Sequence, residues 1–266
     1  MKALRFDRIG SLDYLKILDV RNPEPGQGSV LVRVKAAALN PSDAKNVLGR
    51  MEETTVPRTP GRDFAGVVVE GTEAYLEGTE IFGTGGNLGF SRDGSHAEFI
   101  EVPVEAIKPK PKSLTYVEAA AVPIVALTAW QALIDSAKLS AGQTVLIHGG
   151  SGGVGSFAIQ IAKAHGAKVI ATASTANQDL LKELGADNAV DYKKQKFEDV
   201  AKDVDVALDP IGKDTLARSY GVVKKGGFIV SIVARPNQAE LDKHGIRGAD
   251  RGVVRQTTAT GRRPSG

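Results

Sequence analysis

The chain has 266 residues, of which 42% are hydrophobic and 24% charged, as in a globular protein long enough for two domains. It contains no cysteine, which excludes disulfide bonds, thiolate catalysis and zinc held by cysteine. The net charge is only +3, with both signs interspersed, so we expect no nucleic-acid partner. No apolar run approaches the ~18 residues of a membrane span, and the N-terminus lacks a signal-peptide stretch, which predicts a cytoplasmic protein without a membrane partner.

The first part of the chain consists of short apolar stretches separated by glycine and proline. Strands are expected at residues 2–6, 29–35, 63–70, 80–83 and 97–102. Many short strands with turn signals between them are typical of a compact β-barrel or sandwich. The pattern changes near 108–111, and helices are expected over 115–121 and 126–133.

A glycine-rich stretch follows a predicted strand at 144–147 and fits the pattern G-x-G-x-x-G. The helix after it carries an apolar face and stops at Gly166. A strand, a glycine turn and a helix N-terminus together favour a bound pyrophosphate. The alternative is a merely tight turn between strand and helix. The residues predicted to bind the dinucleotide here are Gly150, Ser151, Gly152, Gly153, Val154 and Gly155.

Strands and helices then alternate to the end of the regular pattern. Strands are expected at 168–173, 189–192, 203–208 and 228–233. One helix is expected to carry Leu180, Leu181 and Leu184 and to end at Gly185, and another is expected around 215–223. Ser174 or Thr175 can cap the first of these helices. This β-α-β-α series predicts an α/β domain with a doubly wound parallel sheet.

The C-terminal segment does not continue this series. A sheet of this kind should receive one more strand and helix after Gly245, but several arginines crowd a segment whose only aliphatic pair is Val253-Val254. We expect a strand attempt, an incomplete C-terminal end of the sheet, and an irregular basic tail over 251–266. A nucleic-acid-binding arm is the alternative, but the segment has no interleaved aromatic residues.

Several motifs resemble those of one known family. Residues 38–45 (ALNPSDAK) look like its N-P-x-D-x-K motif, 60–68 (PGRDFAGVV) like its P-G-x-D-x-x-G-x-V segment, and 94–99 (GSHAEF) like its D-G-x-x-A-E stretch. The chain thus resembles the zinc-independent quinone oxidoreductases of the medium-chain dehydrogenase/reductase superfamily. The resemblance implies a GroES-like catalytic domain over 1–118 and a Rossmann domain over 119–250.

Departures from the zinc-bearing relatives concern the metal. Where those relatives have a cysteine and a Gly-His-Glu motif, this chain has Asn40-Pro41-Ser42-Asp43 and Gly61-Arg62-Asp63, so no catalytic metal is expected. The family also extends beyond this chain's end, which implies a C-terminal truncation. In dimeric relatives the sheets join near that end. A homodimer is therefore in doubt.

The residues after the second Rossmann strand bear on the cofactor. An NAD site places an acidic side chain there, whereas this chain has Ser174 to Asn177. By resemblance Tyr192, followed by two lysines, sits where relatives place phosphate partners. These features favour NADPH, with Ser174 and Tyr192 as contacts. Alternatively, Ser174 only caps a helix and the lysines are solvated.

The resemblance implies hydride transfer to a quinone or an α,β-unsaturated carbonyl compound. Asn40 could orient the nicotinamide or substrate, and Lys45 could meet the developing negative charge. Their alternatives are a turn or cap residue and an exposed lysine. By resemblance Thr128 lies near the nicotinamide; otherwise it is a buried helix threonine.

Other polar residues have ordinary explanations. The four histidines lack metal-ligand spacing and are interpreted as structural, and Asp209 either faces a ligand or caps a loop. Two further hypotheses compete with a reductase: an NADPH-binding protein without turnover, and a truncated product of a frameshift or early stop. The arginine-rich ending is the feature that separates them.

Overall fold

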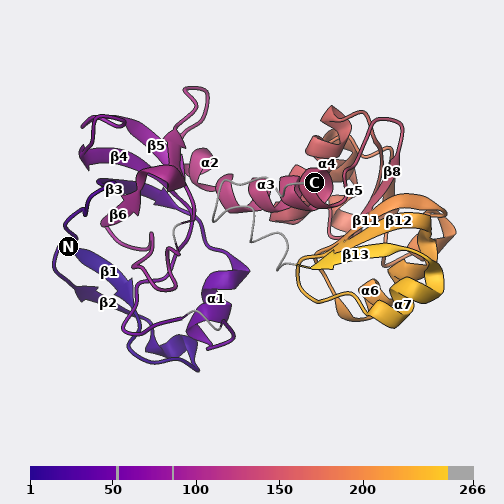
Figure 1. The fold of residues 1–266 in the computed structure, drawn as a ribbon, viewed down its shortest axis with the longest axis horizontal. Helices are drawn as coiled ribbons and strands as arrows, with labels where there is room; N and C mark the ends of the chain where they lie inside the picture. Colours follow the sequence, from indigo (N-terminus) through magenta and orange to yellow (C-terminus); the bar gives the residue numbers. More distant parts are fainter. Residues whose placement is uncertain (52–53, 86, 251–266) are drawn as a thin grey trace. The chain divides into compact units, whose positions relative to one another are not determined.

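The structure is a computed structural model that describes residues 1–51, 54–85 and 87–250. It divides into two compact units, one up to Ile124 and one from Val125, each with its own sheet and core (Figure 1). Within the described residues, no helix has the length and apolar character needed to cross a membrane.

The N-terminal unit is built on a five-stranded antiparallel sheet in the order β6-β3-β4-β5-β7. Its strands are β3 (Ser29–Ala37), β4 (Phe64–Glu70), β5 (Glu80–Gly83), β6 (Phe99–Pro103) and β7 (Ile107–Pro109). Alternate residues of each strand point into one core, which includes Val30, Val32, Phe64, Val68, Ile81, Ile100 and Val102. The many short strands confirm the predicted β-rich N-terminal domain.

Smaller elements complete this unit. Strand β1 (Lys2–Arg5) pairs with β2 (Lys16–Asp19), and the short helices are α1 (Pro41–Val47) and α2 (Tyr116–Ala120). Every residue of β2 is exposed, so this strand has no apolar alternation and the sequence did not reveal it. Thr115 caps α2 in a capping box with Glu118, which fixes where the helix begins.

The second unit contains a six-stranded parallel sheet in the order β10-β9-β8-β11-β12-β13. Its strands are β8 (Thr144–Ile147), β9 (Lys168–Ala173), β10 (Asn188–Asp191), β11 (Val204–Asp209), β12 (Val223–Ser231) and β13 (Arg247–Asp250). The helices are α3 (Pro123–Trp130), α4 (Gly153–Ala164), α5 (Gln178–Glu183), α6 (Lys213–Ser219) and α7 (Gln238–His244). This order confirms the doubly wound sheet and places its switch point between β8 and β11.

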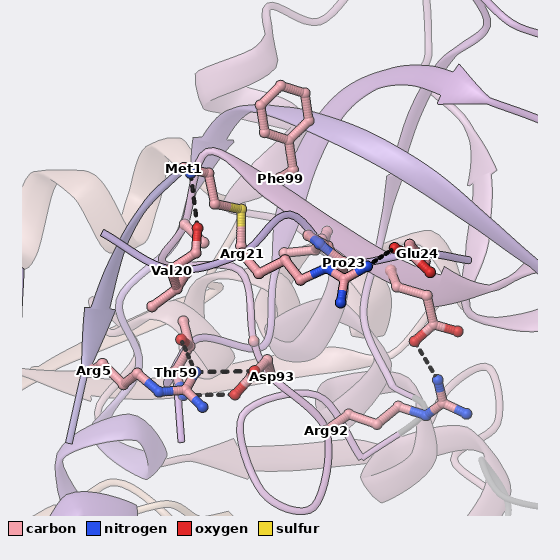
Figure 2. A pocket seen from close by; sticks show the side chains of 14 residues that line it. Met1, Arg5, Val20, Arg21, Pro23, Glu24, Thr59, Arg92, Asp93 and Phe99 are labelled. Carbon is pink, nitrogen blue, oxygen red and sulfur yellow. Dashed lines mark hydrogen bonds and ion pairs between the residues drawn. The ribbon is translucent and has the colours of Figure 1, made fainter. Parts of the chain in front are cut away.

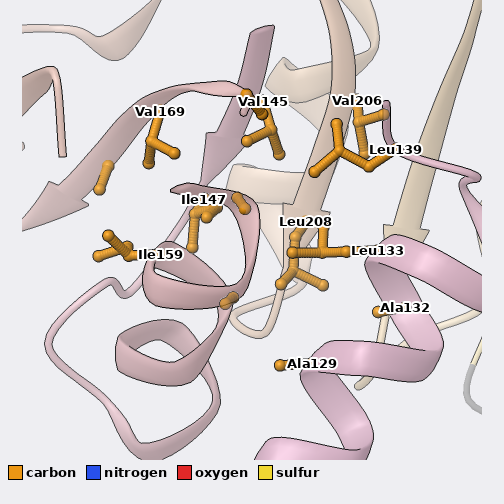
Figure 3. Packing of buried hydrophobic residues seen from close by; sticks show 14 of the residues in the cluster. Ala129, Ala132, Leu133, Leu139, Val145, Ile147, Ile159, Val169, Val206 and Leu208 are labelled. Carbon is orange, nitrogen blue, oxygen red and sulfur yellow. The ribbon is translucent and has the colours of Figure 1, made fainter. Parts of the chain in front are cut away.

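Both faces of this sheet are covered, which explains the nearly continuous apolar runs of its strands. Val145 and Ile147 of β8 pack with Ile159 of α4 in one core, as Figure 3 shows. Leu146, between them in the sequence, points to the opposite core, which Leu216 of α6 and Leu241 of α7 complete. Figure 1 shows α6 and α7 lying together beside β11 to β13.

The strand attempt expected after Gly245 is a regular edge strand of the sheet. Strand β13 pairs in parallel with β12, after a helix α7 that Asn237 caps and that ends at Gly245 in the left-handed conformation (φ 64°). Its sequence signal is weak because RGAD contains no apolar residue larger than Ala249, and Gly248 leaves room for Leu241 to pack against its backbone. The predicted irregular basic tail, 251–266, lies outside the described residues.

Candidate functional site

The turn after β8 is shaped by hydrogen bonds to β9. Gly149 has φ +57°, a backbone conformation that residues with a side chain rarely adopt. Its N–H donates to the hydroxyl of Thr172 over 3.3 Å, and the N–H of Gly150 donates to the Thr172 carbonyl oxygen over 2.8 Å. The carbonyl oxygen of Gly149 accepts the N–H of Gly152 over 2.9 Å. The turn therefore has one defined path into helix α4.

The three glycines of the motif have different surroundings. A Cβ on Gly155 would lie 2.2 Å from the carbonyl oxygen of Gly149, and one on Gly150 would lie 2.7 Å from Leu181. A Cβ on Gly152 would meet only the Gly149 oxygen, at 3.3 Å. Gly150 and Gly155 are thus required for close packing, whereas Gly152 borders open space, as a backbone that a pyrophosphate approaches must.

The N-terminus of α4 faces this loop. Gly152 is the N-cap, and its carbonyl oxygen accepts the N–H of Ser156 over 2.9 Å. The N–H groups of Gly153, Val154 and Gly155 precede that bond, in the first turn, where intrahelical acceptors are lacking. With the helix dipole they form a site suited to an anion. The predicted dinucleotide loop, residues 150–155, is therefore brought together in one place.

Asn177 joins this loop to the residues after β9. Its side-chain amide donates to the hydroxyl of Ser151 over 3.1 Å and to that of Ser174 over 3.4 Å. Ser174 adopts the N-cap position of a short 3₁₀ turn, Thr175–Asn177, but makes no capping bond with its side chain. The predicted contacts Ser151 and Ser174 thus share one partner, Asn177, which is not among the residues predicted for the site.

A carboxylate also lies in this neighbourhood. Asp191 ends β10, and its Oδ2 accepts the hydroxyl of Thr175 over 2.6 Å. This bond is the main cause that lowers the pKa of Asp191, and the ammonium of Lys194, 3.7 Å away, adds to it. The sequence indicated no acid after β9. Since parallel strands end at the same edge, the last residue of the neighbouring strand was the signal that could have revealed it.

Three further residues of the second unit are candidates from the sequence, namely Tyr192, Thr128 and Asp209. Tyr192 follows Asp191 and is 59% exposed, with its N–H bonded to the carbonyl oxygen of Ala173. Thr128 is half-buried on α3. Asp209 is buried at the end of β11, where its carboxylate accepts the N–H groups of Ile211 and Gly212. These bonds support the loop-capping interpretation of Asp209.

In the N-terminal unit, Asn40 lies between two buried carboxylates. It is the N-cap of α1, and its N–H donates to Oδ2 of Asp43 over 2.7 Å. Its side-chain amide donates to Oδ2 of Asp63 over 2.8 Å, while Oδ1 of Asp63 accepts the N–H of Ile124 over 3.0 Å. Asn40 therefore does serve as a cap residue, and its carboxamide is held in one orientation.

Burial governs the protonation of both acids. It raises the pKa of Asp63 to about 6, against the opposing hydrogen bond from Asn40. Burial also raises the pKa of Asp43, with His96 and Arg62 acting in the opposite direction. The described residues contain no group of three or more acidic or histidine side chains arranged to hold a metal ion.

Lys45 lies on α1, half-buried. No carboxylate among the described residues pairs with its ammonium group, and no hydrogen bond there joins it to Asn40. The structure thus places Asn40 and Lys45 on the same short helix without linking their side chains.

A separate hollow of about 570 Å³ opens in the same unit. Figure 2 shows Arg5 turned toward Asp93, to which it is bonded over 3.0 Å. Arg92 forms an ion pair with Glu101. The residues that line it include none of the predicted site residues. Arg5 and Arg92 are already paired with carboxylates, so their positive charges are not available to an anionic ligand.

Comparisons with known families match both units. The family described as "Alcohol dehydrogenase GroES-like domain" matches residues 26–112. The family described as "Zinc-binding dehydrogenase" matches residues 153–251. Together with the strand orders, these matches confirm the predicted GroES-like domain followed by a Rossmann-like parallel sheet.

Individual relatives agree with this assignment. The 2-methylene-furan-3-one reductase of Solanum lycopersicum is 42% identical over 243 residues, which cover 87% of this chain and 62% of that protein. The chloroplastic NADPH-dependent alkenal/one oxidoreductase of Arabidopsis thaliana is 39% identical with the same coverage, so the chain spans about 62% of the length of these relatives. The structure of the quinone oxidoreductase from Coxiella burnetii matches with a TM-score of 0.85 at 31% identity, over 97% of this chain and 87% of that one.

Proposed function

Since the chain belongs to the medium-chain dehydrogenase/reductase superfamily, we propose that it is an NADPH-dependent oxidoreductase. It transfers a hydride to a quinone or an α,β-unsaturated carbonyl compound without a metal ion. The observation that carries this proposal is the loop before α4, where Gly152 borders open space at a helix N-terminus. The names of the relatives support a quinone or enone as acceptor.

The cofactor assignment depends on the residues around Ser174. Its hydroxyl and the amide of Asn177 are neutral donors beside the loop, and Lys193 and Lys194 follow Asp191 in sequence. Asp191, the one carboxylate described there, is already engaged by Thr175 and Lys194. These groups favour a 2′-phosphate, and one of the relatives is named as NADPH-dependent.

When bound, the reduced nicotinamide supplies the hydride. The chain's residues bind the dinucleotide through the loop and meet the charge that develops on the acceptor oxygen. Asn40, fixed by Asp43 and Asp63, presents an oriented carboxamide to the nicotinamide or the substrate. Lys45, which pairs with no carboxylate among the described residues, supplies a positive charge for the enolate or quinol oxygen.

The test is NADPH oxidation with a panel of quinones and enones, with NADH in parallel. Lys45→Met should lower kcat by about 100-fold, the cost of removing one oxyanion donor, while the Kd for NADPH stays unchanged. Lys45→Arg is the matched control that keeps the charge. Tight NADPH binding with no acceptor reduced would refute the reductase and favour a binding protein, and a preference for NADH would overturn the cofactor assignment.

A further inference from the structure

A continuous chain of hydrogen bonds runs beneath the glycine loop, with His148 at its centre. The hydroxyl of Thr172, which accepts the N–H of Gly149, lies 3.3 Å from Nδ1 of His148. On the other side of the ring, Nε2 lies 2.9 Å from the hydroxyl of Ser219. That hydroxyl donates to the carbonyl oxygen of Thr215 over 2.7 Å. The chain joins the turn after β8 to helix α6.

Each hydroxyl carries a single proton, which fixes the direction of the bonds. Ser219 gives its proton to Thr215, so its oxygen accepts from Nε2–H of His148. A neutral imidazole with its proton on Nε2 has an acceptor at Nδ1, so the hydroxyl of Thr172 donates to Nδ1. The oxygen of Thr172 is then directed toward the N–H of Gly149.

The surroundings of His148 keep the ring neutral, as this direction requires. The side chain is 2% exposed, and the edge of Phe197 packs on it with ring centroids 4.7 Å apart. Burial lowers the pKa of His148 to about 4. The charged groups that face it have smaller effects: Asp209 raises the pKa, Arg218 lowers it and Glu198 raises it.

Thr172 holds two successive amides of the loop. Its hydroxyl accepts the N–H of Gly149 and its carbonyl oxygen accepts the N–H of Gly150. The peptide of Gly149 in turn sets the loop, because its carbonyl oxygen accepts the N–H of Gly152 and lies against Gly155. A change in the hydroxyl of Thr172 therefore acts on the entrance to α4.

We propose that His148 is a positioning residue for the dinucleotide. By fixing the direction of the Thr172 hydroxyl, it holds the Gly149 peptide so that the first-turn N–H groups of α4 point toward the pyrophosphate. The inference rests on the proposed function, which it deepens: a group buried beneath the loop, without contact to the ligand, sets the affinity for NADPH.

Three variants test the chain of bonds. Thr172→Val keeps the shape of the side chain but removes its hydroxyl, whereas Thr172→Ser keeps the hydroxyl. Ser219→Ala removes only the group that fixes the tautomer of His148. Thr144→Val is the matched control, because it makes the same change in the same sheet, at the start of β8. The measurements are the Kd for NADPH, amide hydrogen exchange over 149–155, and the ¹⁵N chemical shifts of the two ring nitrogens of His148.

Thr172→Val should raise the Kd about tenfold, as expected for the loss of a hydrogen bond of about 1.4 kcal/mol, and should speed exchange over 149–155. Thr172→Ser should keep the wild-type Kd and exchange rate, and Thr144→Val should change neither quantity. Ser219→Ala should move the proton of His148 partly from Nε2 to Nδ1 and raise the Kd. A Thr172→Val protein with a lower melting temperature but unchanged Kd and exchange would overturn the proposal, as would an unmoved tautomer in Ser219→Ala.

The ligand-free measurements separate this inference from the proposed function. A wild-type chain that binds no NADPH would refute the proposed function and the effect on affinity. Exchange and tautomer, measured without ligand, would still decide whether His148 orders the loop.

Discussion

The side-chain amide of Asn40 donates to the carboxylate of Asp63 over 2.8 Å and thereby ties the start of α1 to the residue before β4. Both oxygens of Asp63 are engaged, since the other accepts the N–H of Ile124. The buried carboxylate thus depends on a neutral donor, and a substitution at Asn40 must act on the protonation of Asp63 as well as on the helix cap.

Asn40→Asp should show this dependence. Aspartate is as good an N-cap as asparagine, but here it removes the donor and places a second negative charge beside Asp63. We expect the free energy of unfolding to fall by about 2 kcal/mol or more at pH 7.5. The loss should be smaller at pH 5, where one of the two acids is protonated. Urea unfolding at both pH values measures it. Asn40→Ala, which adds no charge, should show a smaller difference between them, and equal losses for Asn40→Asp at both would contradict the argument.

Asp63 should make the N-terminal unit less stable as the pH rises. Its pKa is raised from 3.8 to about 6, so the folded state binds more protons than the unfolded state between these values. The stabilisation is complete below pH 3.8 and is lost as the pH rises through 6, by about 3 kcal/mol. Hydrogen exchange of β4 peptides measures it. Asp63→Asn should flatten the profile in this window, and an equally steep profile would assign it to another group.

His148 should give the second unit the opposite slope. Its pKa is lowered from 6.5 to about 4, so the unfolded state binds more protons between these values. Stability is complete above pH 6.5 and falls by about 3 kcal/mol as the pH falls to 4. Trp130, the single tryptophan, lies in this unit and reports its unfolding by fluorescence. Unfolding midpoints, measured by this fluorescence, that rise as the pH falls would contradict the prediction.

Two glycines of the loop should separate folding from binding. Gly155→Ala places a Cβ 2.2 Å from a backbone oxygen, so we expect a loss of about 3 kcal/mol in the free energy of unfolding. Gly152→Ala meets an oxygen only at 3.3 Å, with φ −82°, and should change stability by less than about 1 kcal/mol. Its methyl group faces the open side of the loop, so the Kd for NADPH should still rise at least about tenfold. Calorimetry and a binding titration decide between the two effects.

Regular elements of the second unit could be predicted because their signals are local. Strands β8 and β9 have the predicted bounds, since both are apolar runs that end at a turn. The bounds of β13 could not be predicted, because its place comes from pairing with β12 and from Leu241 packing on Gly248. A strand whose only apolar side chain is that of an alanine is specified by its neighbours.

The same distinction holds for the site. The glycine loop follows from its spacing, whereas the partners of Ser174 depend on where neighbouring strands end. Asn177 and Asp191 are 14 positions apart, yet they bond Ser174 and Thr175, respectively. His148 could be interpreted as structural, but its two hydroxyl partners come from β9 and α6, which no local pattern links.

Ser174 and Asp191 should together set the choice between NADPH and NADH. Ser174→Asp places a carboxylate after β9, which accepts both ribose hydroxyls of NADH and repels the 2′-phosphate of NADPH. We expect the ratio of the Kd values to shift toward NADH by at least about tenfold, or 1.4 kcal/mol. Asp191→Asn should act in the opposite direction, because it removes the negative charge beside Thr175 while keeping an acceptor for that hydroxyl.

The two substitutions also test the site from both sides. If Asp191 serves only to hold Thr175, Asp191→Asn leaves the ratio of the two Kd values unchanged. If its charge reaches the ribose, the preference for NADPH increases, and the increase fades as salt screens the charge. Titrations with both cofactors at low and high ionic strength separate these outcomes. A Ser174→Asp protein that keeps its preference for NADPH would place the 2′-phosphate elsewhere and refute the role of Ser174.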